Sequence, residues 1–252
     1  MLLKDLMCRQ GAFLFCGRSY LPLLLVPIIV AAVLQPAPFD HWFSRRAELI
    51  WELGSLVVAF SGLMVRVLTT GFVPAGTSGR NTKRQIAESL NTDGFYSVTR
   101  NPLYLGNFLV ALGIALAVKV WWLVLIAVMA FAVYYERIIS AEEAFLEVKF
   151  GTDYKRWAER TPVFFPNFQL WQAPHCTFSV RTVLRREFHG FYLIVVVFTL
   201  IELGHDMAEG VSLAASVAGN FAWPAFFWAG TFVYLFLMFL KKRTRLLQVD
   251  GR

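Results

Sequence analysis

Charged residues are scarce in this chain. Asp, Glu, Lys and Arg make up 16% of its 252 residues, whereas apolar residues reach 57% and Phe alone fills 24 positions. Typical soluble domains hold about 25% charged and roughly 45–50% apolar residues. A soluble protein of this size could not bury so much apolar surface, so lipid is the natural solvent for much of it. The composition excludes an ordinary soluble domain and predicts an integral membrane protein.

Cysteine is sparse as well, with residues at Cys8, Cys16 and Cys176. Because their number is odd and their spacing fits no metal-ligand motif, we expect reduced thiols, no disulfide framework and no metal centre. The net charge of +7 does not indicate nucleic-acid binding. A basic chain with long apolar runs is better matched to the anionic headgroups of lipids.

The long apolar runs predict six helices that cross roughly 30 Å of hydrocarbon. We expect them at about Arg18–Leu34, Ala47–Leu68, twice within Leu103–Tyr135, Gly190–Leu203 and Phe221–Leu240. A single helix over Leu103–Tyr135 would be roughly 50 Å long, too long for one crossing. This run is therefore predicted to form a helical hairpin with Lys119 at its tip.

Basic residues predict the orientation of these spans. Of the 24 Lys and Arg residues, only Arg45, Arg46 and Lys119 fall on the side opposite the termini. The positive-inside rule then makes the N- and C-termini cytoplasmic. The first span is expected to be retained, because Gln-Pro-Ala-Pro follows it in place of a signal-peptidase site. We expect the bacterial inner membrane rather than the endoplasmic reticulum.

Two long segments lie on the predicted cytoplasmic side. Phe72–Thr99 is polar and is predicted to be a loop with a short helix at about Thr82–Leu90. Glu136–Arg160 keeps a helical pattern of apolar residues among charges, so it is predicted to continue the fourth helix as an interfacial helix. The expected fold class is therefore all-α and integral to the membrane, with about six transmembrane helices, a helical hairpin and a cytoplasmic interfacial helix.

The first segment with residues suited to chemistry is Gly94–Gly106, Gly-Phe-Tyr-Ser-Val-Thr-Arg-Asn-Pro-Leu-Tyr-Leu-Gly. Pro102 suits the first turn of a helix, where free N–H groups attract anions. Arg100 adds a planar donor fork that can hold a carboxylate or a phosphate. The alternative is a plain helix cap with a basic anchor at the membrane interface.

The second segment is Glu136–Trp157, which contains the adjacent carboxylates Glu142 and Glu143. Adjacent residues point about 100° apart on a helix, so one carboxylate is expected to face solvent while the other turns inward toward Arg100 or a ligand. A carboxylate near apolar surface is costly unless it is paired. The alternative is a solvated helix face on which Glu142, Glu143 and Glu147 have no further role.

Together the two segments resemble the isoprenylcysteine carboxyl methyltransferase and phospholipid methyltransferase superfamily. The pattern of that family is Gly-x-Tyr, Arg-His-Pro-x-Tyr-x-Gly, a helical hairpin, Glu-Glu, and Phe-Gly-x-x-Tyr with a terminal proline. This chain carries it between Gly94 and Pro166, under a third of its length. In the family these elements enclose S-adenosylmethionine at the cytoplasmic interface, and the lipid part of the substrate enters laterally from the bilayer.

The resemblance implies a set of site residues. The residues matched to the cofactor pocket are Tyr96, Arg100, Asn101, Pro102, Tyr104, Gly106, Glu143 and Tyr154. The residues matched to catalysis are Arg100, Glu142 and Glu143. Asn101 departs from the family pattern, which has histidine there. Asparagine can donate a hydrogen bond but cannot titrate near neutral pH, so activity survives only if the family histidine acts as a donor.

The resemblance also implies a domain organisation and an activity. Residues 1–93 would hold the N-terminal helices and a cytoplasmic loop, 94–166 the cofactor-binding core, and 167–252 a linker and two further spans. The expected activity is methyl transfer from S-adenosylmethionine to a membrane-embedded lipid or prenylated acceptor. The chain has no glycine-rich βαβ unit, which argues against a soluble methyltransferase of the Rossmann type.

The identity of the methyl acceptor stays open, and two functions other than methyl transfer stay possible. Phosphatidylethanolamine, an isoprenylcysteine carboxylate, or a smaller hydrophobic thiol or amine would suit a lateral entrance. An amine acceptor would need a base, and Glu142 or Glu143 is available for that. Membrane sterol-type reductases resemble this region too and use NADPH. A membrane protein that keeps the scaffold without enzymatic activity is the third reading.

Overall fold

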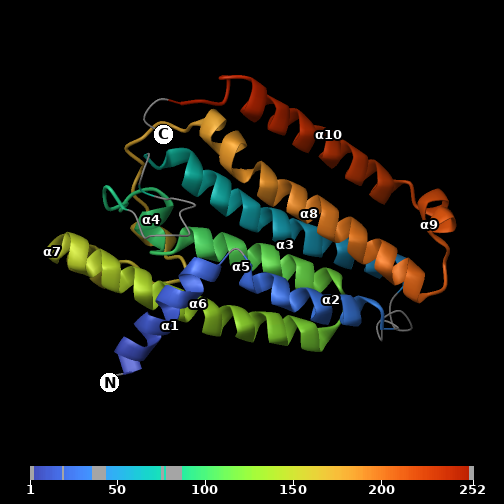
Figure 1. Ribbon diagram of the computed structural model, residues 1–252, viewed down its shortest axis with the longest axis horizontal. Coiled ribbons are helices and arrows are strands. Elements are labelled where there is room, and N and C mark those ends of the chain that lie inside the picture. Colours follow the sequence, from blue (N-terminus) through green and yellow to red (C-terminus); the bar gives the residue numbers. More distant parts are fainter. Residues whose placement is uncertain (1–2, 19, 36–43, 75–76, 78–86, 250–252) are drawn as a thin grey trace.

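The computed structural model describes residues 3–18, 20–35, 44–74, 77 and 87–249 (Figure 1). The helices in these ranges are α1 (Leu3–Gly17), the 3-10 turn η1 (Leu21–Leu25), α2 (Val26–Val33), α3 (Arg45–Phe72), α4 (Phe95–Val98), α5 (Pro102–Ala117), α6 (Trp121–Phe150), α7 (Thr152–Arg160), the 3-10 turn η2 (Phe168–Leu170), α8 (Val180–Ala208), α9 (Leu213–Gly219) and α10 (Ala222–Arg243). In the described chain, β pairing is limited to one isolated bridge, between Gly94 and Gln172. The predicted all-α fold is confirmed.

Four helices in the described ranges, α3, α6, α8 and α10, are long and apolar enough to cross a membrane. A fifth candidate is the bent pair formed by α1 and the helical segment Leu21–Val33. Helix α5 is apolar but has 16 residues, fewer than the roughly 20 that a full crossing needs. The integral membrane fold is confirmed, with four or five full-length candidate spans and the shorter α5 where the sequence predicts six spans.

The chain before α3 differs from its prediction. The sequence predicts one helix over Arg18–Leu34, whereas α1 ends at Gly17 and a new helical segment begins at Leu21, bent by 85° from α1. Pro22 and Pro27 occupy the first turns of η1 and α2. Proline lacks the N–H that would continue a preceding helix, so the apolar run is interrupted. Helix α1 instead packs across α6.

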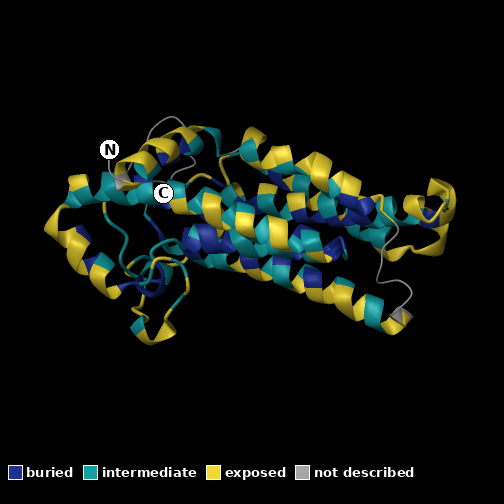
Figure 2. Ribbon diagram, turned by 90° about the horizontal axis from the view of Figure 1, so that it is seen from below, coloured by how far each residue is buried: buried dark blue, intermediate teal, exposed yellow. Residues whose placement is uncertain are grey.

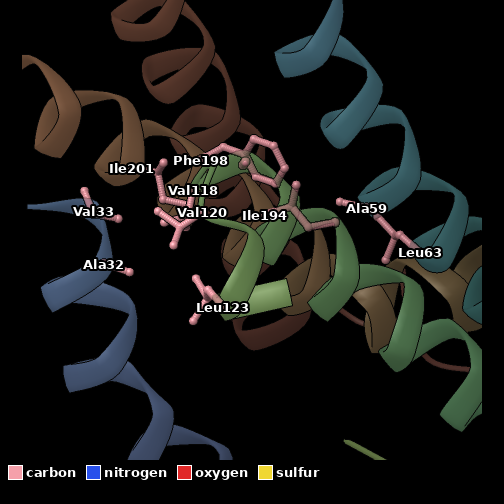
Figure 3. Close-up of a cluster of buried hydrophobic side chains, with 11 residues drawn as sticks. Ala32, Val33, Ala59, Leu63, Val118, Val120, Leu123, Ile194, Phe198 and Ile201 are labelled. Carbon is pink, nitrogen blue, oxygen red and sulfur yellow. The ribbon is translucent and has the colours of Figure 1, made fainter. Parts of the chain in front are cut away.

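The predicted hairpin is confirmed by α5 and α6, which are joined by a turn at Lys119. Lys119 has a φ of 60°, an uncommon value for a residue other than glycine, and its Nζ lies 2.9 Å from Glu52 Oε1 on α3. Figure 3 shows the buried cluster beside the turn, in which Val118 and Val120 lie together with Ile194 and Phe198 of α8. The hairpin is thereby fixed to α3 and α8.

The predicted continuation of the fourth helix over Glu136–Arg160 is helical, but it is divided into two helices. Helix α6 continues to Phe150, and α7 follows after Gly151, which has a φ of 54°. The short helix expected at Thr82–Leu90 falls largely on residues 82–86, outside the described residues, and residues 87–90 are not helical.

The long helices run side by side, and the two ends of the bundle differ. Helices α1, α4 and α7 and the C-terminal end of α10 gather at one end, whereas α9 and the turn between α5 and α6 lie at the other (Figure 1). Many outward helix faces are exposed (Figure 2), and Trp228 and Phe232 of α10 are about 70% exposed. Such faces are compatible with a lipid environment.

Helices α3 and α5 approach so closely that Gly106 has no room for a side chain. A Cβ there would lie 2.7 Å from the carbonyl oxygen of Gly62 and 2.5 Å from Arg66 Cγ. We expect Gly106→Ala to lower the free energy of unfolding by about 1–3 kcal/mol, the usual cost of overpacking. The matched control is Gly54→Ala on α3, where a Cβ would meet no atom within 4 Å. Thermal unfolding in detergent should separate the variants, and equal midpoints would contradict this packing.

Candidate active site

The Arg-Asn-Pro turn before α5 is held in place by the chain that follows α7. The hydrogen bonds between the two segments include Arg100 N to Pro162 O (2.8 Å), Thr99 Oγ1 to Phe164 O (3.0 Å), Asn101 Nδ2 to Val163 O (2.9 Å) and Asn167 N to Val98 O (2.9 Å). Pro102 occupies the first turn of α5 and is buried. Asn101 thus donates to a backbone carbonyl, and its amide helps to fix the turn that carries Arg100.

Arg100 reaches from this turn to the double-glutamate stretch of α6. Its Nη1 lies 2.9 Å from Glu143 Oε1, and both side chains are more than two-thirds buried. A pair that is largely removed from water interacts more strongly than an exposed one and orients both groups. The structure therefore brings together two predicted site residues that are 43 positions apart in the chain.

A pocket of about 350 Å³ opens beside this ion pair, within the range of roughly 300–1,000 Å³ found for small-molecule sites. The residues that line it are Arg100, Ser140, Glu143, Ala144, Glu147, Tyr154, Lys155, Ala158 and Glu159. We call it the Arg100 pocket. Helices α6 and α7 and the Arg-Asn-Pro turn supply its walls, so residues from two separate motifs face one cavity.

Tyr154 is buried in the wall of the Arg100 pocket. Burial, and next the negative charge of Glu143, raise the pKa of Tyr154 to about 12. Its phenol therefore stays protonated throughout the physiological range and can act as a hydrogen-bond donor. By bond geometry, Arg100 Nε and Tyr154 Oη are buried without a hydrogen-bond partner among the described residues, although the guanidinium lies near enough to the phenol to oppose the rise in the Tyr154 pKa. Buried polar groups of this kind normally have partners, so a polar ligand in the pocket would fit here.

Glu142 lies beside a different set of groups. Tyr104 Oη donates to Glu142 Oε1 at 2.9 Å, and Arg18 Nη1 lies 3.7 Å from the same oxygen. The expectation that one of the two glutamates faces solvent is wrong, because the exposed fractions of their side chains are only 26% for Glu142 and 31% for Glu143. The bend after α1 explains this, since it carries Arg18 onto α6.

The remaining predicted residues do not line the Arg100 pocket. The Tyr96 carbonyl accepts a hydrogen bond from Trp157 Nε1 at 3.1 Å. Burial, and next the charge of Glu142, raise the pKa of the Tyr96 phenol, which groups this residue electrostatically with Glu142 and Tyr104. Gly106 packs against α3, as described above. Tyr104 and Glu142, joined by their hydrogen bond, therefore make up a second polar group, adjacent to the Arg100 pocket.

The sequence analysis missed an ionic network between α3, α5, α6 and α8. Arg66 makes two bonds to the buried Glu187, Nε to Oε2 at 2.8 Å and Nη2 to Oε1 at 3.1 Å. Arg66 Nη1 also donates to Asn107 Oδ1 at 2.6 Å, and Asn107 Nδ2 donates to Tyr135 Oη at 3.2 Å. A charged residue within an apolar helix is the signal that could have revealed this network.

The described residues contain no group of three or more His, Cys, Asp and Glu side chains arranged to hold a metal ion. The histidine His175 lies away from this site, with its Nδ1 at 2.6 Å from Asp93 Oδ2.

Comparison with known proteins decides the family. A family model described as "Phospholipid methyltransferase" matches residues 52–153. The protein-S-isoprenylcysteine O-methyltransferase of Schizosaccharomyces pombe is 30% identical over 162 residues, which cover 60% of this chain and 68% of that protein. The chain belongs to the isoprenylcysteine and phospholipid methyltransferase superfamily. This superfamily comprises membrane methyltransferases, and its family match includes Arg100, Glu142 and Glu143.

Two bacterial proteins with names that refer to metal resistance are also similar to this chain. The nickel-cobalt-cadmium resistance protein NccN of Alcaligenes xylosoxydans xylosoxydans is 29% identical over 160 residues, 56% of this chain and 75% of NccN. The cobalt-zinc-cadmium resistance protein CzcN of Cupriavidus metallidurans is 31% identical over 148 residues, 58% of this chain and 64% of CzcN. No solved structure gives a significant match.

Proposed function

We propose that this protein transfers a methyl group from S-adenosylmethionine to a membrane-embedded lipid or prenylated acceptor at the cytoplasmic interface. The observation that supports it most is the ion pair of Arg100 and Glu143 in the lining of a pocket, in a chain of this superfamily. We also propose residues 94–166 as the cofactor-binding core, between N-terminal helices in 1–93 and the last two long helices in 167–252.

The donor set of the Arg100 pocket fits the amino-acid end of S-adenosylmethionine, which carries a carboxylate and an ammonium group. Arg100 can hold the carboxylate through its planar fork, and Glu143 can hold the ammonium group. The Tyr154 phenol, protonated at physiological pH, can donate a further hydrogen bond. When bound, the cofactor would supply a methyl group activated by a sulfonium centre. The protein's part would be mainly to align the reactants and to exclude water.

We expect the methyl acceptor to bind beside the second polar group, which contains Glu142 and Tyr104. Glu142 is next to Glu143 on α6 and is held by Tyr104 and Arg18, so it can orient a polar head or accept a proton from an amine acceptor. Aromatic rings lie close by, with Phe131 and Tyr135 stacked at 4.1 Å and Phe108 at 5.0 Å from Phe131. Such rings provide an apolar surface for a lipid chain.

We propose that both termini and the Arg100 pocket lie on the cytoplasmic side of the membrane, because the positive-inside rule places the basic segments there. The gathering of α1, α4 and α7 with the C-terminal end of α10 at one end of the bundle supports this (Figure 1). The bacterial inner membrane is the proposed location, and the bacterial relatives NccN and CzcN support it.

Calorimetric titration of the purified protein tests the proposal. We expect S-adenosylmethionine and S-adenosylhomocysteine to bind and NADPH not to bind. Incubation with methyl-labelled S-adenosylmethionine and a membrane lipid extract should then transfer label to the lipid fraction. Binding of NADPH alone would replace the proposal by a reductase function, and binding of neither cofactor would contradict enzymatic activity of this type.

A further inference from the structure

A groove lies between α1 and α6, away from the Arg100 pocket, with a volume of about 720 Å³. Its apolar wall includes Phe13 and Leu14 of α1 and Val133 and Tyr134 of α6. Phe13 is 74% and Val133 51% exposed, so the wall is open to the surroundings. An open apolar groove beside a candidate membrane span is accessible to lipid chains.

One end of this groove is basic. Arg9 and Arg137 are among its described lining residues, which include no carboxylate. Gln10 Oε1 accepts from Arg137 Nε at 2.9 Å, and Arg137 Nη1 donates to the Val133 carbonyl at 2.8 Å. Glu136, which is 60% exposed, lies 3.5 Å from Arg137 Nη1 and offsets part of the charge. Two guanidinium groups above an apolar wall complement a phosphate that carries acyl chains.

We propose that this groove binds an anionic phospholipid, with its phosphate between Arg9 and Arg137 and an acyl chain along Phe13 and Val133. The groove is distinct from the acceptor site proposed above. Arg137 precedes Glu142 by five residues on α6, about 7.5 Å along the axis and roughly 140° around it. The two sites therefore lie on different faces of α6 and are offset along its axis.

The proposed lipid has a consequence for the second polar group. Helix α1 crosses α6 at Gly11, where a Cβ would lie 1.9 Å from the Arg137 carbonyl oxygen. Arg18 follows the end of α1, and it pairs with Glu142 and stacks 4.1 Å above the Phe15 ring. A lipid that contacts both helices holds α1 against α6 and so stabilises the position of Arg18. This consequence for activity rests on the proposed function, whereas lipid binding itself does not.

The test uses the full chain purified in detergent and incubated with mixed micelles of phosphatidylglycerol and phosphatidylcholine in equal amounts. Native mass spectrometry then counts the lipid retained by each protein. We expect the wild type to retain phosphatidylglycerol at least about tenfold over phosphatidylcholine. The variant Arg9→Gln/Arg137→Gln should lose this preference. The control Arg156→Gln/Arg160→Gln removes the same charge from exposed positions on α7 and should keep it.

Three outcomes would overturn the proposal: no preference in the wild type, an unchanged preference in Arg9→Gln/Arg137→Gln, or an equal loss in the control. If the double variant does not fold, the single variant Arg9→Gln replaces it, because Arg9 is exposed. This variant should reduce the preference for phosphatidylglycerol several-fold. An unchanged preference would again overturn the proposed lipid site. Methyl transfer from S-adenosylmethionine is measured separately in vesicles of each lipid, to which a membrane lipid extract is added as the source of the methyl acceptor. Absence of methyl transfer in all vesicles, with lipid retention intact, would contradict the proposed function and support the lipid site.

Discussion

Arg100→Ala is expected to weaken the binding of S-adenosylmethionine by about 100-fold or more. Removal of one member of a desolvated charge pair costs about 2–5 kcal/mol in binding, and each 1.4 kcal/mol is a factor of ten. The substitution removes the proposed partner of the cofactor carboxylate and leaves Glu143 beside the pocket without its guanidinium. Glu143→Ala is expected to have a similar effect, because it removes the proposed partner of the ammonium group.

Isothermal titration of each variant measures this effect. The matched control is Arg156→Ala, since Arg156 is an exposed arginine on α7 that pairs with Asp153 at 3.3 Å and does not line the Arg100 pocket. Arg156→Ala should keep the stability of the wild type, whereas Arg100→Ala and Glu143→Ala should lose part of it, because each leaves one member of a largely buried pair without its partner. The titrations are therefore made at a temperature at which all three variants are folded. A wild-type titration curve for Arg100→Ala and Glu143→Ala would remove both residues from the site.

Arg66→Ala is expected to give the largest loss of stability, about 3–5 kcal/mol. Breaking a buried ion pair at one side leaves an uncompensated charge, and Glu187 is only 5% exposed. Asn107 Oδ1 would lose its donor as well. Glu187→Ala should destabilise the protein comparably. Replacement of both by Met should recover part of the loss, because two apolar side chains leave no charge behind.

Thermal unfolding in detergent measures these differences. The control is Asp153→Ala, which breaks an ion pair whose two side chains are both more than 70% exposed, and exposed pairs contribute roughly 0–1 kcal/mol. If Arg66→Ala unfolds at the same temperature as Asp153→Ala, the network between α3, α5, α6 and α8 does not stabilise the fold.

The parts of the fold that were predictable depend on local signals. The length of the apolar run from Leu103 to Tyr135 predicts the hairpin, since a bilayer limits how long one span can be. Pro102 predicts the start of α5 through its fixed φ and its missing N–H. The mixture of charges and apolar residues after Tyr135 predicts the continuation of α6. Each of these features is determined by residues close together in the sequence.

The features that were missed depend on packing between distant residues. The sequence of α1 contains no long apolar run, so the crossing of α1 and α6 at Gly11 has no local signal. The assignment of Gly106 to the cofactor pocket stays a prediction from its motif, but its close approach to Gly62 of α3 could not be inferred from the sequence. The partner of Arg66 could not be inferred, because Glu187 lies 121 residues away.

The sequence allowed us to predict that Arg100 and Glu143 belong to one site. It did not allow us to predict that Glu142 belongs to a second group of residues. The spacing of the motifs predicts that Arg100 and Glu143 lie close together. In the structure, Arg100 Nη1 lies 2.9 Å from Glu143 Oε1. That Glu142 would contact Tyr104 and Arg18 instead depends on the rotation of α6 and on the bend after α1. Neither is encoded in the motif. The distinction matters, because it separates the residues proposed for the cofactor from those proposed for the acceptor.

The most direct test of the proposed function is an experimental structure of the protein with S-adenosylhomocysteine. The account predicts that its amino-acid end lies in the Arg100 pocket, with the carboxylate on Arg100, the ammonium group on Glu143 and the Tyr154 phenol in hydrogen-bond contact. Density for the ligand in any other cavity, with the ion pair of Arg100 and Glu143 unchanged, would contradict it.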